Sequence, residues 1–598
     1  MPAVVGLSGL YHESTACLLV DGALVAAASE ERFTRRKHDA RLPVEAFRWC
    51  LAAAPGGPLD VGDLAAVAWF ERPVAKLARQ LWAGPPAGDD DLAWLDPGRA
   101  ERAIRERLGW DGPLLTFPHH LSHAASAWCF SGLSEAAVLT VDGVGEWATT
   151  AYGRAAGERL ELFDEVRFPH SLGLFYAAIT GYLGFRVDGG EGQVMGLAPY
   201  GRPRYADRLR RVLIDEPGGG FRLDLAFFDF LAGRRMFSDA LCELLDGPPR
   251  RPGEPLDERH RDVARSAQEV LEEVLLAKVR WLHRRVGGDS LCLAGGVALN
   301  CVANGRLLRD GPFRRLFVPP APGDAGGALG AAALAWRQLA GEGGEGGWSP
   351  VQPLHHAFLG PRSTADEVAE LLAAAGLPAE DFRGREGDLV EAVAARLAAG
   401  QVVGWFQGAM EIGPRALGAR SILASPLDPG MRDRVNRHVK RREEFRPFAP
   451  AVLAGRAADF LALDHPVPFM TETCAVRRPA ELPAVTHVDG SARPQTVDPA
   501  TAPRFAALLA AFARRTGVPV LMNTSFNVRG EPIVATPADA LSSFADAGLD
   551  ALAIEGFVVD RAALPEGWAA LLAAGRPRPA AADRRREPGL GGALYSFV

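Results

Sequence analysis

The sequence predicts an α/β protein with two domains, and three observations point to this class. Short apolar strands are punctuated by turn residues near the N-terminus. A long amphipathic helix expected over 261–286 leads directly into an apolar strand at 290–296, an alternation typical of a mostly parallel sheet. A Gly-rich and then Pro-punctuated stretch at 338–356 separates this region from a new strand–helix pattern. With 598 residues, 48% of them hydrophobic, the chain is long enough for several buried cores.

The first half of the chain contains the same pattern of elements twice. Residues 2–29 are predicted to form a strand and then a hairpin, because Asp21-Gly22 supplies the positive φ angles of a tight turn. Residues 136–154 again predict strand, glycine loop and strand, with a third strand over 159–168. Two such units favour a duplicated, actin-like nucleotide-binding domain. Two unrelated hairpins are the alternative interpretation.

The linker places the main domain boundary near its end. We expect a first domain over 1–350, a second domain over 351–574 and a loose C-terminal tail over 575–598. The tail is rich in Pro, Arg and Gly, a composition that rarely packs into a core. A further helix is expected over 119–130, where small and apolar residues recur at helical spacing.

Composition excludes several classes of protein. The net charge of −7 and the pI near 6.1 argue against a general nucleic-acid binder. Seven scattered cysteines without a CxxC pair argue against a disulfide scaffold and a thiolate zinc site. The N-terminus has no basic region of a signal peptide, and apolar runs break before the roughly 18 residues of a membrane span. We therefore expect a cytoplasmic monomer or homodimer that engages neither membrane nor nucleic acid.

A candidate metal site is contained in the first half. His119 and His123, four residues apart, share one face of the expected helix and suit joint coordination of one ion. Asp142 ends an apolar strand, and Asp324 lies between a Pro-rich strand exit and a Gly-rich helix start. Two histidines and two aspartates suit Fe(II), Mn(II) or Zn(II). Taken alone, such a histidine pair is far more often helix surface than a ligand pair, and His120 should point elsewhere.

Glycine loops suggest a nucleotide site in the same domain. The strand at 290–296 ends in Gly295-Gly296 and is followed by a helix. Glycines let the backbone approach a ligand closely, and a helix N-terminus presents free N–H groups to an anion. Together with the two glycine loops upstream, this pair indicates a nucleotide in the cleft of an actin-like fold.

The second domain contains four segments that bring cations beside Gly and Pro turns: 411–426, 436–452, 489–497 and 523–534. Cations near strand ends predict a phosphate-binding pocket. For the basic run within 436–452 alone, the alternative is a charged helix face. The polar residues concerned are Arg415, Arg420, Lys440, Arg441, Arg442, Arg446, Arg493, Ser525, Asn527 and Arg529.

Together these motifs resemble one family, the ATP-dependent O-carbamoyltransferases of the nodulation and antibiotic-tailoring type. The matching stretches cover nearly the whole chain in one order and include HHLSHA, TVDGVGEW, LAGGVALNCVANG, APGDAGGALG, VKRREEFRPFAP, DGSARPQTV and NTSFNVRGEPIV. The resemblance implies that the first domain is actin-like and similar to TsaD, with a metal for which iron is the usual ion. It implies that the second domain is similar to YrdC.

The resemblance also implies an activity. The second domain would use carbamoyl phosphate and ATP, with Mg²⁺, to make carbamoyladenylate, and the first would pass the carbamoyl group to a hydroxyl of a small molecule, as in antibiotic tailoring. The alternative is an enzyme that modifies tRNA with threonylcarbamoyladenosine, but the acidic charge balance disfavours tRNA. A non-catalytic sensor related to sugar kinases is disfavoured by the intact set of metal ligands.

Individual residues are carried over by motif. His12 in the first glycine loop is a candidate general base, since imidazole titrates near neutral pH, and a loop histidine that only binds phosphate or water is the alternative. Asp229 is a candidate contact to the acceptor. The resemblance assigns metal ligation to His119, His123, Asp142 and Asp324, handling of carbamoyl phosphate and ATP to Arg415, Lys440, Arg493 and Ser525, and nucleotide contacts to Gly143, Glu191, Gly295, Gly296, Asn300, Arg446, Asn523 and Arg529.

Overall fold

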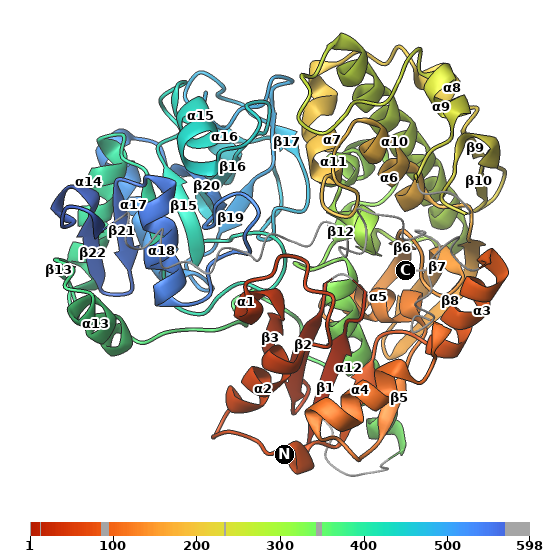
Figure 1. Ribbon diagram of the computed structural model, residues 1–598, viewed down its shortest axis with the longest axis horizontal. Helices are drawn as coiled ribbons and strands as arrows, with labels where there is room; N and C mark the ends of the chain where they lie inside the picture. Colours follow the sequence, from red (N-terminus) through yellow and green to blue (C-terminus); the bar gives the residue numbers. More distant parts are fainter. Residues whose placement is uncertain (1, 12, 85–94, 232–234, 343–349, 569–598) are drawn as a thin grey trace. The chain divides into compact units, whose positions relative to one another are not determined.

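The structure is a computed structural model that describes residues 2–11, 13–84, 95–231, 235–342 and 350–568 (Figure 1). The chain forms two compact units. The first comprises Met1–Glu30 and His38–Leu354, and the second comprises Glu31–Lys37 and the described chain from His355 onward. The predicted base His12 and the predicted loose tail lie outside the described residues.

The first unit is built around two five-stranded sheets. In the first sheet the order is β3-β2-β1-β4-β5, and in the second it is β8-β7-β6-β11-β12. In both, the central strand (β1 or β6) pairs antiparallel with the next strand in the chain (β2 or β7). On its other side it pairs parallel with β4 or β11. The strands are β1 Ala3–Ser8, β2 Thr15–Val20, β3 Ala23–Ser29, β4 Ala66–Trp69, β5 Leu114–Thr116, β6 Glu135–Val141, β7 Ala148–Ala156, β8 Arg159–Arg167, β11 Ser290–Ala294 and β12 Arg315–Phe317.

The matching strand order and direction confirm the predicted duplication. Both hairpins form where the sequence predicts them, with the turn at Asp21 and Gly22 in the first unit's opening sheet. Each half is a strand, a hairpin and two further parallel strands, which is the actin-like arrangement expected. The alternative of two unrelated hairpins is therefore wrong.

Two helices connect these sheets to the candidate site. α5 (His119–Trp128) lies against β6 and β11, and α12 (Asp324–Glu342) lies against α5 and β1. The two helices approach closely because α12 is rich in Gly and Ala. A Cβ added at Gly330 would lie 1.8 Å from the backbone oxygen of Ser122, so only glycine fits there. The close packing places the first turn of α12 beside α5.

The predicted long helix is α10, which spans Glu258–Val286. Asp257 caps it by accepting a hydrogen bond from the backbone N–H of His260. The other elements of the unit are α2 Val44–Ala52, η1 Val61–Asp63, α3 Pro73–Ala83, α4 Arg99–Leu108, α6 Leu172–Tyr182, α7 Glu191–Leu197, η3 Ala198–Tyr200, α8 Ala206–Leu209, β9 Leu213–Asp215, β10 Phe221–Leu223, η4 Leu225–Phe227, α9 Asp239–Leu244, η5 Gly296–Leu299 and α11 Cys301–Asp310.

The second unit is an eight-stranded mixed sheet with the order β13-β22-β21-β14-β15-β20-β16-β19. One face is buried by α14 and α17 and the other by α13 and α18, which gives three layers. The α/β class predicted for this part is confirmed. The strands of this sheet are β13 Glu380–Asp381, β14 Val403–Phe406, β15 Arg420–Ala424, β16 Ala449–Leu453, β19 Gln495–Val497, β20 Val520–Ser525, β21 Ala551–Ile554 and β22 Phe557–Asp560.

The helices of the second unit include a six-residue π-helix, η6 (Val435–Lys440). The remaining elements are α1 Glu31–Thr34, α13 Ala365–Ala374, α14 Glu386–Ala398, α15 Met431–Arg434, η7 Ala454–Arg456, α16 Ala457–Phe460, β17 Cys474–Ala475, β18 Ser491–Ala492, α17 Pro503–Thr516, α18 Pro537–Ala547 and η8 Arg561–Ala563. Within the described parts of both units, no helix combines the length and apolar character needed to cross a bilayer.

A short N-terminal segment belongs to the second unit. Glu31–Lys37, which contains α1, is held there by Arg32, which donates to the backbone oxygen of Gly413 at 3.1 Å, and by Arg35. The Arg35 guanidinium donates to the backbone oxygens of Ile533 at 2.7 Å and Pro532 at 3.0 Å, and its Nε lies 3.3 Å from Asp539 Oδ1. The chain therefore passes from the first unit to the second, back again, and across once more after Leu354.

Candidate functional site

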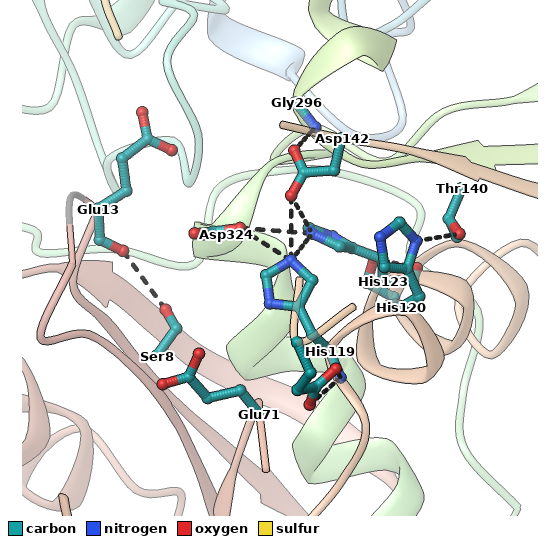
Figure 2. A network of polar contacts seen from close by, with 12 residues as sticks. Ser8, Glu13, Glu71, His119, His120, His123, Thr140, Asp142, Gly296 and Asp324 are labelled. Carbon is teal, nitrogen blue, oxygen red and sulfur yellow. Dashed lines mark hydrogen bonds and ion pairs between the residues drawn. The ribbon is translucent and has the colours of Figure 1, made fainter. Parts of the chain in front are cut away.

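Four predicted ligands from three separate elements meet in the first unit. His119 and His123 lie on the first turns of α5, Asp142 directly follows β6, and Asp324 begins α12. All four are buried. Figure 2 shows both imidazole rings and both carboxylates pointing toward one another. The i,i+4 spacing on α5 and the close packing of α12 bring them together.

The distances within this group are short and regular. His119 Nε2 lies 2.9 Å from His123 Nε2 and 3.0 Å from Asp142 Oδ2. His123 Nε2 lies 3.4 Å from Asp142 Oδ2 and 3.3 Å from Asp324 Oδ1. His119 Nε2 lies 3.5 Å from Asp324 Oδ1. One ligand atom from each residue thus lies within 4.8 Å of all the others.

These spacings fit one transition-metal ion. At metal–ligand distances near 2.05 Å, ligand atoms of a tetrahedral ion lie about 3.3 Å apart and adjacent ligands of an octahedral ion about 2.9 Å apart. The observed range of 2.9–3.5 Å covers both geometries. The donor set of two imidazoles and two carboxylates suits Fe, Mn or Zn. The group is therefore a possible metal-binding site, as the sequence predicts.

The electrostatics of the group also favour a cation. Burial alone would lower the pKa of His123, but the hydrogen bonds and charges of Asp142 and Asp324 raise it to about 10. Burial opposes ionisation of Asp142, yet His119 and His123 hold its pKa well below the usual range. Asp142 and Asp324 thus stabilise positive charge at this point, which a bound metal cation would supply.

Neighbouring groups fix the orientation of these ligands. Glu146 accepts hydrogen bonds from the backbone N–H of His119, at 2.9 Å to Oε1 and 3.1 Å to Oε2. The backbone N–H of Gly296 donates to Asp142 Oδ1 at 2.7 Å, which leaves Oδ2 for the group. His120 Nδ1 lies 2.7 Å from Thr140 Oγ1 and its ring lies outside the ligand set, as its position on the helix predicts.

The predicted glycines lie directly beside the metal group. Gly295 has φ of +93°, and a Cβ there would lie 2.2 Å from the backbone oxygen of Val141, so the turn requires glycine. Gly296 follows and contacts Asp142. Gly143 adjoins Asp142, and its carbonyl accepts from Ser171 Oγ at 2.6 Å. The structure thus brings these three glycines to the candidate metal centre.

Three other predicted residues of this unit have structural partners instead. Glu191 accepts from the backbone N–H groups of Asp188 and Gly189 at the start of α7. Asn300 caps α11 and exchanges hydrogen bonds with Gln268 at 2.9 and 3.0 Å. Asp229 is half-buried, and its backbone N–H lies 3.4 Å from the oxygen of Met236. Their predicted ligand contacts stay predictions.

In the second unit a buried lysine marks the centre of the cationic segments. Lys440 ends the π-helix η6, a distortion often found at functional sites. Its Nζ donates to the backbone oxygens of Ser525 and Asn527 at 2.8 Å each, and to Asn527 Oδ1 at 2.6 Å. Ser525 Oγ lies 3.2 Å from the same nitrogen. The structure thus brings Lys440 and Ser525 together, as the resemblance implies.

Further cations surround this lysine. Burial lowers the pKa of Lys440 well below its ordinary value, and the charges of Arg442 and Arg446 lower it further. Burial and the charge of Arg446 likewise depress the pKa of Arg442, to which Arg493 adds. The pKa of Arg446 is lowered mainly by burial, despite Glu443. Lys440 is buried and Arg442 and Arg446 are partly exposed, so three cations gather in one region, where a bound anion would offset their repulsion.

A fixed amide lies beside these cations. Asn523 Nδ2 donates to Gln495 Oε1 at 2.8 Å and to the backbone oxygen of Ala416 at 3.1 Å. Gln495 is itself oriented by donating to the oxygen of Leu417 at 2.6 Å. Asn523 Oδ1 and Arg493 Nε are buried without a hydrogen-bond partner among the described residues. These two atoms are candidate contacts for a ligand in this part of the second unit.

The remaining predicted cations are placed differently. Arg415 is half-buried in the loop between β14 and β15. Glu411 shapes this loop, because its Oε1 accepts from the backbone N–H of Leu417, Ala419 and Arg420 at 2.7–3.1 Å. Arg529 is exposed and lies 3.8 Å from Glu443.

Sequence reasoning missed three residues that organise these sites. Glu146 lies four residues after Asp142 in TVDGVGEW, and a carboxylate so close to a predicted ligand was a usable signal. Glu411 accepts from backbone N–H groups six to nine residues along the chain, and Gln495 orients the side chain of Asn523 across 28 residues. No spacing rule marks either contact.

The chain is similar to several known proteins over most of its length. Residues 103–333 match the family model "Carbamoyltransferase N-terminus", and residues 394–561 match "Carbamoyltransferase C-terminus". An uncharacterized protein of Synechocystis, sll1178, is 43% identical, with 95% of this chain and 98% of that protein covered. Nodulation protein NolNO of Sinorhizobium fredii is 37% identical, with 94% and 81% covered. Component A of the Acidaminococcus fermentans (R)-2-hydroxyglutaryl-CoA dehydratase is a solved structure with 15% identity and a TM-score of 0.30, which covers 57% of this chain and all of that chain.

Proposed function

The chain belongs to the carbamoyltransferase family, and on that premise we propose that it is an ATP-dependent O-carbamoyltransferase. In the proposed reaction, carbamoyl phosphate loses its phosphate to water, and the carbamate oxygen attacks the α-phosphorus of ATP. Pyrophosphate leaves and carbamoyladenylate forms. A hydroxyl of a small-molecule acceptor then attacks the carbamoyl carbon, and AMP leaves. The acceptor is a natural product of the antibiotic-tailoring kind.

The observation that carries this proposal is the cationic cluster of the second unit around the buried Lys440, whose Nζ is held by the backbone oxygens of Ser525 and Asn527. The charges of Arg442 and Arg446 repel that of Lys440, and the charges of Arg446 and Arg493 repel that of Arg442. Bound phosphate groups would relieve this repulsion and offset the charge that develops as pyrophosphate leaves. We therefore assign the activation half-reaction to this unit.

The amide of Asn523 supports a carbamoyl substrate. Asn523 Nδ2 donates to Gln495 and to Ala416, which fixes the orientation of the amide and identifies its other atom, Oδ1, as the acceptor. A carbamoyl group carries an amino group that needs such an acceptor, and Arg493 Nε supplies a donor for an oxygen. Ser525 follows on the same face of β20, where Lys440 reaches it. These groups would hold the amino, carbonyl and phosphate parts of the substrate together.

The transfer half-reaction is assigned to the first unit. A metal ion held by His119, His123, Asp142 and Asp324 would supply Lewis acidity toward a phosphate. Gly295 and Gly296 bring the end of β11 to this group, and we expect the adenylate to bind beside it. Iron, Mg²⁺ and the base role of His12 belong to this proposal.

Release of pyrophosphate from ATP, dependent on carbamoyl phosphate, tests the proposal directly. We expect release in the wild type and its loss in Lys440→Met. The matched control is Arg437→Ala, which removes an exposed cation of the same π-helix that donates to Glu444. Mass spectrometry with a panel of hydroxylated acceptors should show a mass gain of one carbamoyl group. Absence of pyrophosphate release in the wild type would refute the assignment.

A further inference from the structure

The loop 407–419, between β14 and β15, orients both amides that lie beside the cations of the second unit. The backbone oxygen of Ala416 accepts from Asn523 Nδ2 at 3.1 Å. The backbone oxygen of Leu417 accepts from Gln495 Nε2 at 2.6 Å. A shift of this loop would therefore change where the acceptor Asn523 Oδ1 lies.

Arg420 closes the base of this loop. It is fully buried, and its guanidinium carbon lies 3.6 Å from the centroid of the Phe406 ring, which favours a cation. Its Nη1 donates to the backbone oxygen of Gln407 at 3.1 Å and to that of Ala419 at 3.2 Å. These are the first and the last residue of the loop. One side chain therefore holds both ends of the loop together.

The segment 357–361, which lies just after the boundary between the two units, pairs with the first part of the loop. The backbone N–H of Met410 donates to the oxygen of Pro361 at 2.9 Å, and the N–H of Gly360 donates to the oxygen of Met410 at 2.8 Å. The oxygen of Pro361 also accepts from Arg420 Nη2 at 2.9 Å. Arg420 thus joins the loop to the segment that connects the units.

The N-terminal segment of the second unit, Glu31–Lys37, holds the same loop from another point of the chain. Arg32 is 6% exposed, and its Nη2 donates to the backbone oxygen of Gly413 at 3.1 Å. Burying an arginine costs free energy unless charged or polar groups surround it, and Glu31, at 2.9 Å from Arg32 Nη1, supplies the charge. Gly413 lies two residues before Arg415, a predicted contact of carbamoyl phosphate and ATP.

We propose that Arg32 and Arg420 are positioning residues for the activation of carbamoyl phosphate. Each acts through the loop 407–419, which places Arg415 and fixes the amide of Asn523. The inference rests on the proposed activation half-reaction and adds to it two arginines that act on the substrate through other residues. The activation half-reaction then depends on stretches of the chain that are far apart in sequence, because the loop is held from both sides of the first unit's sequence.

The KM for carbamoyl phosphate in pyrophosphate release separates positioning from folding. We expect Arg32→Ala to raise this KM and to lower kcat/KM about 10- to 100-fold, since displacing substrate-holding groups by on the order of 1 Å can cost that much. Arg32→Lys keeps a donor for the Gly413 oxygen and should recover part of the loss. Arg420→Lys should recover less relative to Arg420→Ala, because an ammonium cannot replace a planar fork that donates to three oxygens. A purely structural role would lower kcat, through the amount of active enzyme, at unchanged KM.

The matched control is Arg36→Ala, which removes an exposed cation of the same N-terminal segment and should leave the KM unchanged. Hydrogen exchange of the full chain without substrate is the second readout, and the amides of 407–419 should exchange faster in Arg32→Ala than in wild type or Arg36→Ala. An unchanged KM in Arg32→Ala, an equal effect of Arg36→Ala, or wild-type exchange of the loop in Arg32→Ala would overturn the inference. Failure of the proposed function would appear separately, as absence of carbamoyl-phosphate-dependent pyrophosphate release in the wild type, and the exchange measurement would still test the hold on the loop.

Discussion

Both carboxylate oxygens of Glu146 accept from the backbone N–H of His119, which caps α5. Pro118, which precedes the helix, offers no side-chain cap. A carboxylate at a helix N-terminus is stabilising because it satisfies free N–H groups and opposes the positive end of the helix dipole. Glu146 therefore sets where α5 begins, and so where both histidines of the candidate metal group lie.

Replacing Glu146 should weaken metal binding without removing a ligand. We expect Glu146→Ala to lower metal affinity about 10- to 100-fold, the usual effect of losing a group that orients ligands. Glu146→Gln keeps one acceptor oxygen and should lose less. Competition with a chelator, followed by elemental analysis, measures both variants. Equal affinity in Glu146→Ala and wild type would show that this cap does not position the site.

Removing a ligand should have a larger effect. His119→Ala and Asp324→Ala should each retain far less than the roughly one metal ion per chain expected for the wild type, because three ligands remain around a buried charge. His355→Ala, at an exposed position in the second unit, is the control. The protein should be prepared without a His-tag or chelator. Wild-type metal content in His119→Ala would rule out the proposed ligand set.

The two half-reactions should separate by point substitution. Arg493→Ala or Lys440→Met should slow pyrophosphate release by roughly 30-fold to several thousand-fold, since leaving a buried anion unpaired costs about 2–5 kcal/mol. Asp142→Ala should spare pyrophosphate release and block product formation. Parallel measurement of pyrophosphate and carbamoylated product distinguishes the two steps. Equal loss of both in Asp142→Ala would contradict the two-site scheme.

Glu411 should be essential for the loop that contains Arg415. Glu411→Ala leaves three buried backbone N–H groups without their acceptor, and each such loss costs about 1–3 kcal/mol. We expect the second unit to unfold at lower temperature by a correspondingly large margin, and Glu411→Gln to unfold between that variant and wild type. Calorimetry resolves the transitions of the two units. A melting profile of Glu411→Ala that matches wild type would contradict this role of Glu411.

His465 should make the second unit less stable at alkaline pH. Its hydrogen bond to Glu472, against the effect of burial and with help from Asp464, raises the pKa of His465 to about 9. The folded chain then binds the proton more tightly than the unfolded chain, so the stabilisation is complete below about pH 6.5 and is lost as pH rises through about 9. Because His465 is 38% exposed, solvent screening limits the effect to about 1 kcal/mol.

The comparison that checks this is the melting temperature of His465→Gln against wild type at pH 6.5 and pH 9.5. The variant should be less stable than wild type at the lower pH and nearly equal to it at the higher pH. A difference in melting temperature between wild type and His465→Gln that grows with pH would contradict this prediction.

Much of the first unit could be predicted because its signals are local. The Asp21-Gly22 turn and the apolar face of α10, which includes Val263 and Val270, are set by neighbouring residues and appear where expected. The ligands Asp142 and Asp324 were predictable for a related reason. Both lie at the ends of elements, where a side chain reaches a shared edge of the fold.

The parts that escaped prediction depend on tertiary context. Helix α3 was not expected, because Arg79 faces inward and Leu81 outward, the reverse of the pattern that periodicity detects. Gln495 orients Asn523 across 28 residues, and no spacing rule reports such a contact. A linear boundary near residue 350 likewise could not reveal that Glu31–Lys37 belongs to the second unit.

The segment Glu31–Lys37 limits how the gene can be divided into parts that each encode one unit. A fragment that begins at His355 lacks Arg35, and its Pro532 and Ile533 carbonyls lose their donors. A fragment that ends at Leu354 carries an orphan helix whose partners are encoded elsewhere. No single cut in the chain therefore separates the two units. Expression as two polypeptides, or recombination at one crossover, would remove Glu31–Lys37 from the second unit.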